Sequence, residues 1–390
     1  MGKRIGMEVS IAAAEAVKQA NVDVISAYPI TPQTHIVEHL SELVANGDLD
    51  ADFFCVESEH SALSVCVGAA ATGARTFTCT SSQGLALMSE ITYIASGMRL
   101  PIVMIIANRT LSAPLSIWND HSDAMSIRDC GWIQFFVENG QEVYDHVFVA
   151  YRLAEESSIH FPAIINMDGF ILSHVIEPIE MIEQEKIDQF LPPYQPVHQL
   201  HPDHPVTMGA FALPAIFSET KKAQEEALRS SMPKIINTWK AFGDMTGRYY
   251  HPVETYKSED AETLLVAMGS YGETASVAVD KMREEGKSVG LVKIRLWRPF
   301  PFEAFKKATA CAKQLVVIDR AISVGACGPV ASEVKATLYG EARRPSVYNF
   351  VAGISGRDVT PLDFIKMVDK AEIEIEEGNK EGFEIYGVRG

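Results

Sequence analysis

The sequence lacks several features that mark common functional classes. Its six cysteines include no pair in a C-x-x-C arrangement, and an iron–sulfur cluster normally needs cysteines spaced that closely. No apolar stretch reaches the roughly 18 residues needed to span a bilayer, and the N-terminus has no apolar signal segment. Acidic residues outnumber basic ones by 51 to 34, which argues against nucleic acid as a partner. We therefore expect a cytoplasmic protein with free, buried thiols, no metal ligands, no membrane contact and no cluster of its own.

The length of 390 residues exceeds what one ordinary hydrophobic core supports, so we expect two domains. Strand-like and helix-like runs alternate over residues 1–175, where Pro101–Ala107 has the continuous apolar character of a central parallel strand. This alternation predicts an α/β domain with a parallel, doubly wound sheet. Residues 176–258 break the rhythm with closely spaced prolines and an amphipathic pattern over Lys221–Phe242. We interpret them as an extended Pro-rich linker with one long helix, packed on the first domain. A smaller α/β domain is expected over residues 259–390.

The most informative segment is Glu57-Ser58-Glu59-His60-Ser61-Ala62. It follows a strand-like run, Asp52–Val56, and precedes a small-residue helix predicted over Ala62–Ala71. A carboxylate at such a junction lies at the sheet edge where α/β enzymes bind ligands. Two alternatives stay open: Glu59 only caps the helix, since an acid suits the first turn, or Glu57 is the functional carboxylate.

Two further junctions carry polar side chains. In Tyr28-Pro29-Ile30-Thr31-Pro32, Thr31 precedes a helix predicted to begin at Pro32. Its hydroxyl group either contacts an anionic ligand at the helix N-terminus or serves as an ordinary N-cap. The turn formed by Ser82, Gln83 and Gly84 either faces a ligand or merely tightens the chain, because small residues there allow close backbone approach.

Arg109 follows the apolar run that ends at Ala107. A guanidinium at the carboxyl end of a parallel strand can bind a substrate carboxylate through two parallel hydrogen bonds. The alternative is an ion pair with Asp120 or Asp123. His121 lies close to both acids and could titrate near neutrality; we expect it to order its loop rather than to act as a catalytic base.

Three of these segments, residues 28–32, 57–62 and 108–112, together resemble the alpha subunit of the 2-oxoacid:ferredoxin oxidoreductases, most of all the pyruvate enzyme in its split-subunit form. The resemblance is strong over residues 5–175 and weaker beyond them. It implies a thiamine pyrimidine-binding-like first domain and a transketolase C-terminal-like second domain. It also implies that Glu59 activates thiamine diphosphate, and that Thr31 and Arg109 contact the 2-oxoacid. The turn at Ser82, Gln83 and Gly84 is the further candidate for cofactor contact.

The usual diphosphate motif of thiamine enzymes, Gly-Asp-Gly followed by Asn-Asn, is missing. The pairs Gly47-Asp48 and Gly243-Asp244 lack the third glycine, and no Asn-Asn occurs. The cofactor is therefore expected to be shared with a partner subunit, which binds the diphosphate through Mg²⁺. The resemblance places 4Fe-4S clusters on partner subunits as well.

By resemblance, the complex contains beta, gamma and delta-type subunits. It decarboxylates pyruvate oxidatively, passes the acyl group to coenzyme A and passes electrons to ferredoxin or another acceptor. An aromatic or branched-chain 2-oxoacid is an alternative substrate. A non-catalytic scaffold subunit and half of a transketolase-like transferase are alternatives of other kinds.

Overall fold

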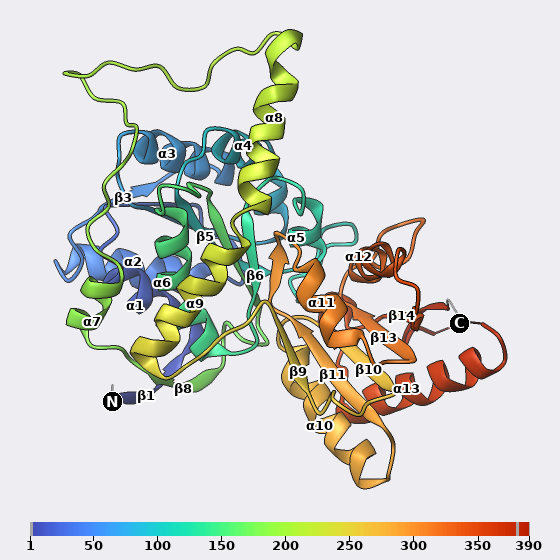
Figure 1. Cartoon of the computed structure of the whole chain (residues 1–390). Helices are drawn as coiled ribbons and strands as arrows, with labels where there is room; N and C mark the ends of the chain where they lie inside the picture. The colour runs from blue at the N-terminus through green and yellow to red at the C-terminus, as the bar shows by residue number, and fades with distance from the viewer. Residues whose placement is uncertain (1–2, 380–381, 390) are drawn as a thin grey trace.

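The computed structural model describes residues 3–379 and 382–389 and contains two α/β units that lie side by side (Figure 1). The first unit is built on a seven-stranded sheet with the order β12-β6-β7-β5-β4-β2-β3. Its strands are β2 (Val24–Ala27), β3 (Asp52–Cys55), β4 (Thr76–Thr80), β5 (Ile102–Asn108), β6 (Ile133–Phe136), β7 (Ala163–Asp168) and β12 (Leu296–Arg298). All neighbours pair in parallel except β12, which runs antiparallel to β6.

Helices cover both faces of this sheet, as side-chain alternation along β5 requires. Met104 packs into the core under α3 (Glu59–Ala71) and α4 (Ser82–Gly97). Its neighbour Ile105 packs into the core on the other face. That core is formed with α1 (Val9–Gln19), α2 (Thr34–Ala45) and α6 (Gly140–Ala154). The predicted parallel, doubly wound sheet is therefore confirmed.

The second unit has a six-stranded sheet with the order β15-β14-β13-β10-β11-β9. Its strands are β9 (Val253–Tyr256), β10 (Thr263–Ala267), β11 (Val289–Ile294), β13 (Gln314–Asp319), β14 (Ser346–Val351) and β15 (Phe383–Ile385), with only β9 antiparallel to its neighbour. Helices α10 (Tyr271–Glu284) and α13 (Pro361–Glu376) cover one face, and α11 (Phe302–Thr309) and α12 (Pro329–Leu338) cover the other. The second, smaller α/β unit is thus present as predicted.

The segment between the units contains more regular structure than the sequence suggested. Strand β8 (Ile176–Glu180) pairs antiparallel with β1 (Arg4–Glu8) and is followed by α7 (Gln184–Phe190), α8 (Pro214–Arg229) and α9 (Met232–Thr246). The prediction of one helix over Lys221–Phe242 is wrong, because the helix is interrupted between α8 and α9. Pro233 lies in the first turn of α9, where its missing N–H and its ring prevent a helix from continuing through it.

The cysteine prediction also needs a correction. No disulfide joins the six thiols, and Cys66, Cys79 and Cys130 are buried. Cys55 and Cys311, however, are exposed, because Cys55 ends the edge strand β3 and Cys311 lies in the turn after α11. Among the described residues, no helix is long and apolar enough to cross a bilayer, and no three Cys, His, Asp or Glu side chains are grouped to hold a metal ion.

Near the contact between the two units, two strands pair with sheets other than those expected from their place in the sequence. β12 lies within the range expected for the second domain, yet it completes the first sheet by pairing with β6. β9 lies within the expected linker, yet it pairs with β11 of the second sheet. The range 259–390 is therefore not a self-contained unit, and the exact domain boundaries stay a proposal.

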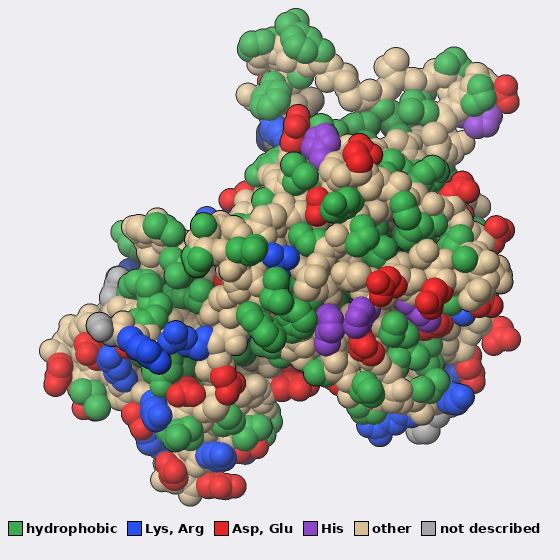
Figure 2. All heavy atoms as spheres, turned by 180° about the vertical axis from the view of Figure 1, so that it is seen from behind, with side chains coloured by type: hydrophobic (Ala, Val, Ile, Leu, Met, Phe, Trp, Pro, Cys, Tyr) green, Lys and Arg blue, Asp and Glu red, His purple; other side chains and the backbone are tan. Residues whose placement is uncertain are grey.

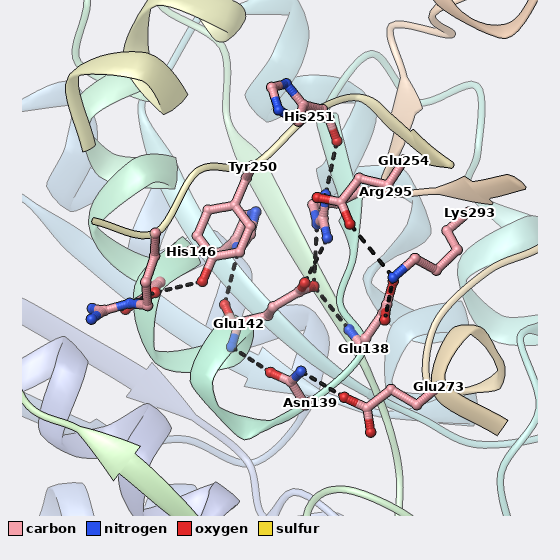
Figure 3. A network of polar contacts seen from close by, with 12 residues as sticks. Glu138, Asn139, Glu142, His146, Tyr250, His251, Glu254, Glu273, Lys293 and Arg295 are labelled. Carbon is pink, nitrogen blue, oxygen red and sulfur yellow. Dashed lines mark hydrogen bonds and ion pairs between the residues drawn. The ribbon is translucent and has the colours of Figure 1, made fainter. Parts of the chain in front are cut away.

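A buried network of charges fills this junction (Figure 3). The guanidinium of Arg295, between β11 and β12, donates to both carboxylate oxygens of Glu142 at 2.6 and 3.2 Å, and to Glu254 at 2.6 Å. Beside it, Lys293 lies 2.8 Å from Glu138. Burial and the neighbouring Glu142 raise the pKa of Glu138 to about 7. Arg295 thus neutralises acids from the first unit and from the connecting segment.

Replacing Arg295 by methionine is expected to lower the free energy of unfolding by about 3–5 kcal/mol, because Glu142 is left buried without its partner. Chemical unfolding of the purified chain checks this. The matched control is Arg229→Met, whose exposed pair with Glu225 on α8 is worth less than about 1 kcal/mol. Equal effects of the two changes would contradict a structural role for the network.

Candidate active site

The candidate residues lie at the carboxyl edge of the first sheet. Strand order changes direction there: the chain passes from β2 to β3 on one side, then returns to β4 and β5 on the other. Ligands of open α/β sheets bind in the crevice at such a point. Thr31 follows β2, Glu59 follows β3, Ser82 follows β4 and Arg109 follows β5.

Glu59 is the first residue of α3, which begins three residues earlier than predicted. The N-cap is Ser58, whose side chain accepts from the backbone N–H of Ser61 at 3.2 Å. Glu59 lies in the first turn of α3, where an acid suits the helix dipole, so that alternative stays open beside a role in ligand binding. Glu59 is only 7% exposed, yet within the described chain its carboxylate has no hydrogen bond or ion pair. A buried carboxylate without a partner is costly, and this one is free to bind a group from outside the chain.

Glu57, the rival carboxylate, is exposed and accepts a hydrogen bond from the Ser61 hydroxyl group at 2.6 Å. That hydrogen bond lowers the pKa of Glu57. A solvated, ionised carboxylate of this kind is less suited to proton sharing than the buried Glu59.

Gly84, in the first turn of α4, lets the chain after β4 pack closely against Glu59. A Cβ atom added to Gly84 would lie 2.6 Å from Glu59 Oε1 and 2.5 Å from Thr80 Oγ1, so only glycine fits there. Thr80 Oγ1 and Gln83 Nε2 are buried and have no hydrogen-bond partner in the structure. The Glu59 carboxylate, the Thr80 hydroxyl group and the Gln83 amide nitrogen therefore lack hydrogen-bond partners in the described chain, although buried polar groups are normally hydrogen-bonded.

Asp123 holds the neighbouring turns together. One of its carboxylate oxygens accepts from the backbone N–H groups of Ser82 at 3.0 Å and Arg109 at 2.9 Å, and the other accepts from Asn108 Nδ2 at 3.0 Å. Burial raises the pKa of Asp123 to about 7, and these hydrogen bonds oppose the shift. The sequence interpretation weighed Asp123 only as an ion-pair partner of Arg109 and missed this role.

Arg109 and Thr31 are brought into direct contact. The buried guanidinium of Arg109 donates to the carbonyl oxygen of Thr31 at 3.0 Å and to that of Ser116 at 2.8 Å. Burial lowers the pKa of Arg109, and Asp123 opposes this. Within the described chain the guanidinium forms no ion pair, so the alternative of a salt bridge to Asp120 or Asp123 is wrong.

The predicted helix start at Pro32 also needs correction. Helix α2 begins at Thr34 with Gln33 at the N-cap position, because Ile30–Gln33 first form a turn closed by the Gln33 N–H and the carbonyl of Ile30 at 2.9 Å. Thr31 is therefore not an N-cap. It is exposed, so its side chain remains accessible to a ligand.

His121 lies at the contact between the two units. Its Nε2 atom is 2.8 Å from Asp168, at the end of β7, and its backbone N–H donates to the carbonyl of Arg320. Asp168 also accepts from Arg320 Nη1 at 2.6 Å and from the backbone N–H of Ser270 at 2.9 Å. Burial alone raises the pKa of Asp168, but Arg320 and His121 outweigh it and hold that pKa well below its usual range. This geometry favours a role for His121 in ordering the loop.

The network around Asp168 was missed at the sequence level. Asp168 ends a strand, and Arg320 directly follows one. The strand-end rule that identified Arg109 applies to both residues, so it could have placed each of them at a sheet edge, but it does not predict that they contact each other.

The site residues thus form two groups. Glu59 and Gly84 adjoin each other, as do Thr31 and Arg109, and Ser82 connects the groups through Asp123. No direct contact between Glu59 and Arg109 occurs among the described residues.

Comparisons with known proteins identify the family. A model described as "Pyruvate flavodoxin/ferredoxin oxidoreductase, thiamine diP-bdg" matches residues 15–239, and one described as "Pyruvate:ferredoxin oxidoreductase core domain II" matches residues 261–364. The chain belongs to the pyruvate:ferredoxin oxidoreductase family. This confirms the predicted family, its oxidoreductase class and the presence of a thiamine diphosphate-binding domain.

Relatives align with this family member over nearly their whole length. It is 47% identical to pyruvate synthase subunit PorA of Pyrococcus furiosus, over 96% of this chain and 95% of the relative. The corresponding subunit of Thermotoga maritima is 46% identical, over 95% and 94% of the two chains. Ketoisovalerate oxidoreductase subunit VorA of Pyrococcus horikoshii is 44% identical, over 94% and 93%.

Solved structures support the fold. The 2-oxoglutarate:ferredoxin oxidoreductase from Magnetococcus marinus superposes with a TM-score of 0.74 at 19% identity, and the match covers 95% of this chain and 65% of that one. A split-gene transketolase, an inactive beta4 tetramer, superposes with a TM-score of 0.56 at 13% identity, over 94% and 98% of the two chains. The transketolase-like character of the fold is thereby confirmed.

The residues present fit the pyrimidine half of thiamine diphosphate. Glu59 offers an unpaired carboxylate for a ring nitrogen, and Thr80 offers an unpaired hydroxyl group near it. Gly84 allows Glu59 to lie directly against the first turn of α4.

Gly84→Ala is expected to lower turnover of the assembled enzyme at least 10-fold, because the added methyl group overlaps Glu59 and Thr80 and displaces the carboxylate. Steady-state kinetics with 2-oxoacids, together with circular dichroism, separate this effect from unfolding. Gly340→Ala is the control, since its methyl group meets no atom within 4 Å. Full activity of Gly84→Ala would show that the position of Glu59 is unimportant.

Proposed function

We propose that this chain is the alpha subunit of a pyruvate:ferredoxin oxidoreductase that acts only with partner chains. The reaction is the oxidative decarboxylation of pyruvate, with the acyl group passed to coenzyme A and electrons passed to ferredoxin or another acceptor. The observation that carries the proposal is the buried, unpaired carboxylate of Glu59 beside Gly84 and Thr80. The pyruvate synthase relatives support pyruvate as the substrate.

Glu59 is the proposed activating residue. Thiamine diphosphate supplies, when bound, a nucleophilic carbon that accepts the 2-oxoacid. Glu59 shares a proton between its carboxylate and the pyrimidine ring nitrogen, which favours the tautomer able to take the thiazolium proton. Burial of Glu59 at the start of α3 keeps water from competing for that proton.

Arg109 and Thr31 are the proposed anchors of the substrate carboxylate. The two bonds of Arg109 to the carbonyls of Thr31 and Ser116 fix the direction of the guanidinium. A planar guanidinium held in this way can present its remaining N–H groups to a carboxylate. The exposed Thr31 side chain adds a hydroxyl group.

Partner subunits are proposed to supply the rest. This chain lacks the Gly-Asp-Gly and Asn-Asn motifs and closely spaced cysteines, so Mg²⁺, the diphosphate contacts and the 4Fe-4S clusters are assigned to beta, gamma and delta-type chains. We also place the complex in the cytoplasm.

A branched 2-oxoacid is the second candidate substrate, favoured by the similarity to the ketoisovalerate enzyme subunit. Dye reduction by the purified complex, measured with pyruvate, 2-ketoisovalerate and an aromatic 2-oxoacid in the presence of coenzyme A, discriminates these. No reduction with any of them would leave the scaffold interpretation.

Glu59→Gln is expected to lower turnover about 10²-fold or more, because the amide cannot exchange the proton. Binding of thiamine diphosphate should change less, since its diphosphate is held elsewhere. Glu57→Gln is the matched control and should keep near-normal turnover, because that carboxylate is exposed. If the two changes had equal effects on turnover, Glu59 would not be the activating group.

Arg109→Lys is expected to cost roughly 2–3 kcal/mol in kcat/KM, because lysine keeps the charge but loses the two-pronged geometry. Thr31→Val should cost about 1 kcal/mol. It keeps the carbonyl that accepts from Arg109 and removes only the hydroxyl group. Both losses should be similar for 2-oxoacids with different tails. Unchanged kinetics of Arg109→Lys for every 2-oxoacid would assign the arginine a structural role.

A further inference from the structure

One segment of the chain projects from the body with an apolar surface. This arm comprises residues 201–223, which are the extended stretch 201–213 and the first ten residues of α8 (Figure 1). Hydrogen bonds to the body of the protein fix the chain just outside both ends of the arm. The Leu200 N–H donates to the carbonyl of Ala71, at the end of α3, and Gln224 donates to Ser96 near the end of α4.

Most apolar side chains of the arm are exposed in the described chain, although Met208 packs against the core under α3 and α4. Phe211 is 87% exposed, and Leu213, Ile216 and Phe217 are each more than half exposed. Seen from the opposite side, hydrophobic side chains gather on the projecting part of the molecule (Figure 2). All of the first ten residues of α8 are exposed, and a helix of this length is marginal in water without packing.

A second apolar strip lies on α4, the helix that begins at the turn containing Gly84. Leu87, Tyr93 and Ile94 are exposed there, and Glu90 is the charged residue between them. α4 packs beside α3, which carries Glu59. The strip therefore lies on the outer side of the two helices that form the candidate cofactor site, and Gln224 ties the arm to the same α4.

We propose that the arm and the α4 strip together bind the partner subunit that holds the diphosphate and Mg²⁺ half of the cofactor site, with the arm acting as a clasp. The inference rests on the proposed function, which requires a second chain to cover Glu59. It adds that the partner contacts the arm and the α4 strip. It also adds that the contacting surface of the partner is apolar and needs no particular charge.

The area that a stable interface requires favours contact through the arm and the α4 strip together. A stable interface needs about 800 Å² from each partner, and an aromatic side chain contributes roughly 150–250 Å². The three residues of the strip fall short of this. The arm brings two phenylalanines and several aliphatic side chains, which extend the apolar area toward the required size.

Charge favours a different chain over a second copy. The formal net charge of this protein is −17, so two copies repel each other at close range. The arm itself has Asp203 and Glu219 against Lys221 and Lys222, which gives zero net charge. The arm therefore does not repel a partner chain electrostatically.

The test uses the co-expressed complex carrying Phe211→Ser and Phe217→Ser. We expect the affinity of this chain for the diphosphate-binding subunit to fall at least 10-fold, measured by subunit titration and native mass spectrometry. The melting temperature of the chain alone should be unchanged. The control is Glu225→Ser with Arg229→Ser, an exposed pair on α8 outside the arm, which should leave assembly unaffected.

Hydrogen exchange provides a measurement without substitution: amides 214–223 should exchange rapidly in the free chain and be protected in the complex. Wild-type affinity of the serine variant, or no protection, overturns the proposal. Loss of self-association instead of partner binding assigns the arm to a second copy and also overturns it. A complex that assembles through the arm but reduces no dye with any 2-oxoacid refutes the proposed function and leaves the binding result standing.

Discussion

One buried carboxylate, Asp123, fixes the relative positions of the turns that form the candidate site. Ser82 and Arg109 follow different strands, and their backbone N–H groups converge on the same oxygen. Without those donors the charge would be expensive to bury, as the raised pKa of Asp123 indicates. The two turns and the acid therefore depend on one another. The direction of the Arg109 side chain, and with it the contact to Thr31, follows from this arrangement.

Buried charges also hold the two α/β units together. Asp168 accepts from Arg320 across the junction, and Glu142 accepts from Arg295 at a second point. Pairs of this kind gain little net stability over apolar packing, because desolvation offsets much of the attraction. They do penalise any arrangement that separates the partners. We therefore interpret both pairs as determinants of orientation more than of stability.

The sequence was informative wherever the signal was local. The apolar run at Pro101–Ala107 corresponds to β5, and the strand-end rule placed Glu59 and Arg109 at one sheet edge. Side-chain periodicity and strand ends are properties of a few adjacent residues. The break at Pro233 was equally local, but the amphipathic pattern continued through it and was given too much weight. The late start of α2 depended on a turn whose hydrogen bonding was not anticipated.

The contacts of Asp123, Asp168 and Arg320 were not predictable in the same way. Each joins positions far apart in the chain, and many acids and arginines at strand ends offer the same local pattern. The close packing of Glu59 and Thr80 against Gly84 was also hidden, since it depends on how separate segments of the chain approach each other. The pairing of β12 with the first sheet was missed because β12 is only three residues long and its partner, β6, lies far earlier in the sequence.

The pairing of β12 with β6 restricts how the two units can move relative to each other. Rotation of one unit against the other would have to break the pairing of β12 with β6, while β11, which leads into β12, is held in the second sheet by β10 and β9. The connection between β11 and β12 is a poor hinge, because it consists of Arg295 alone and that residue is buried. We therefore expect the two units to move together, so that large changes in access to the crevice depend on contacts between chains rather than on closure within this one.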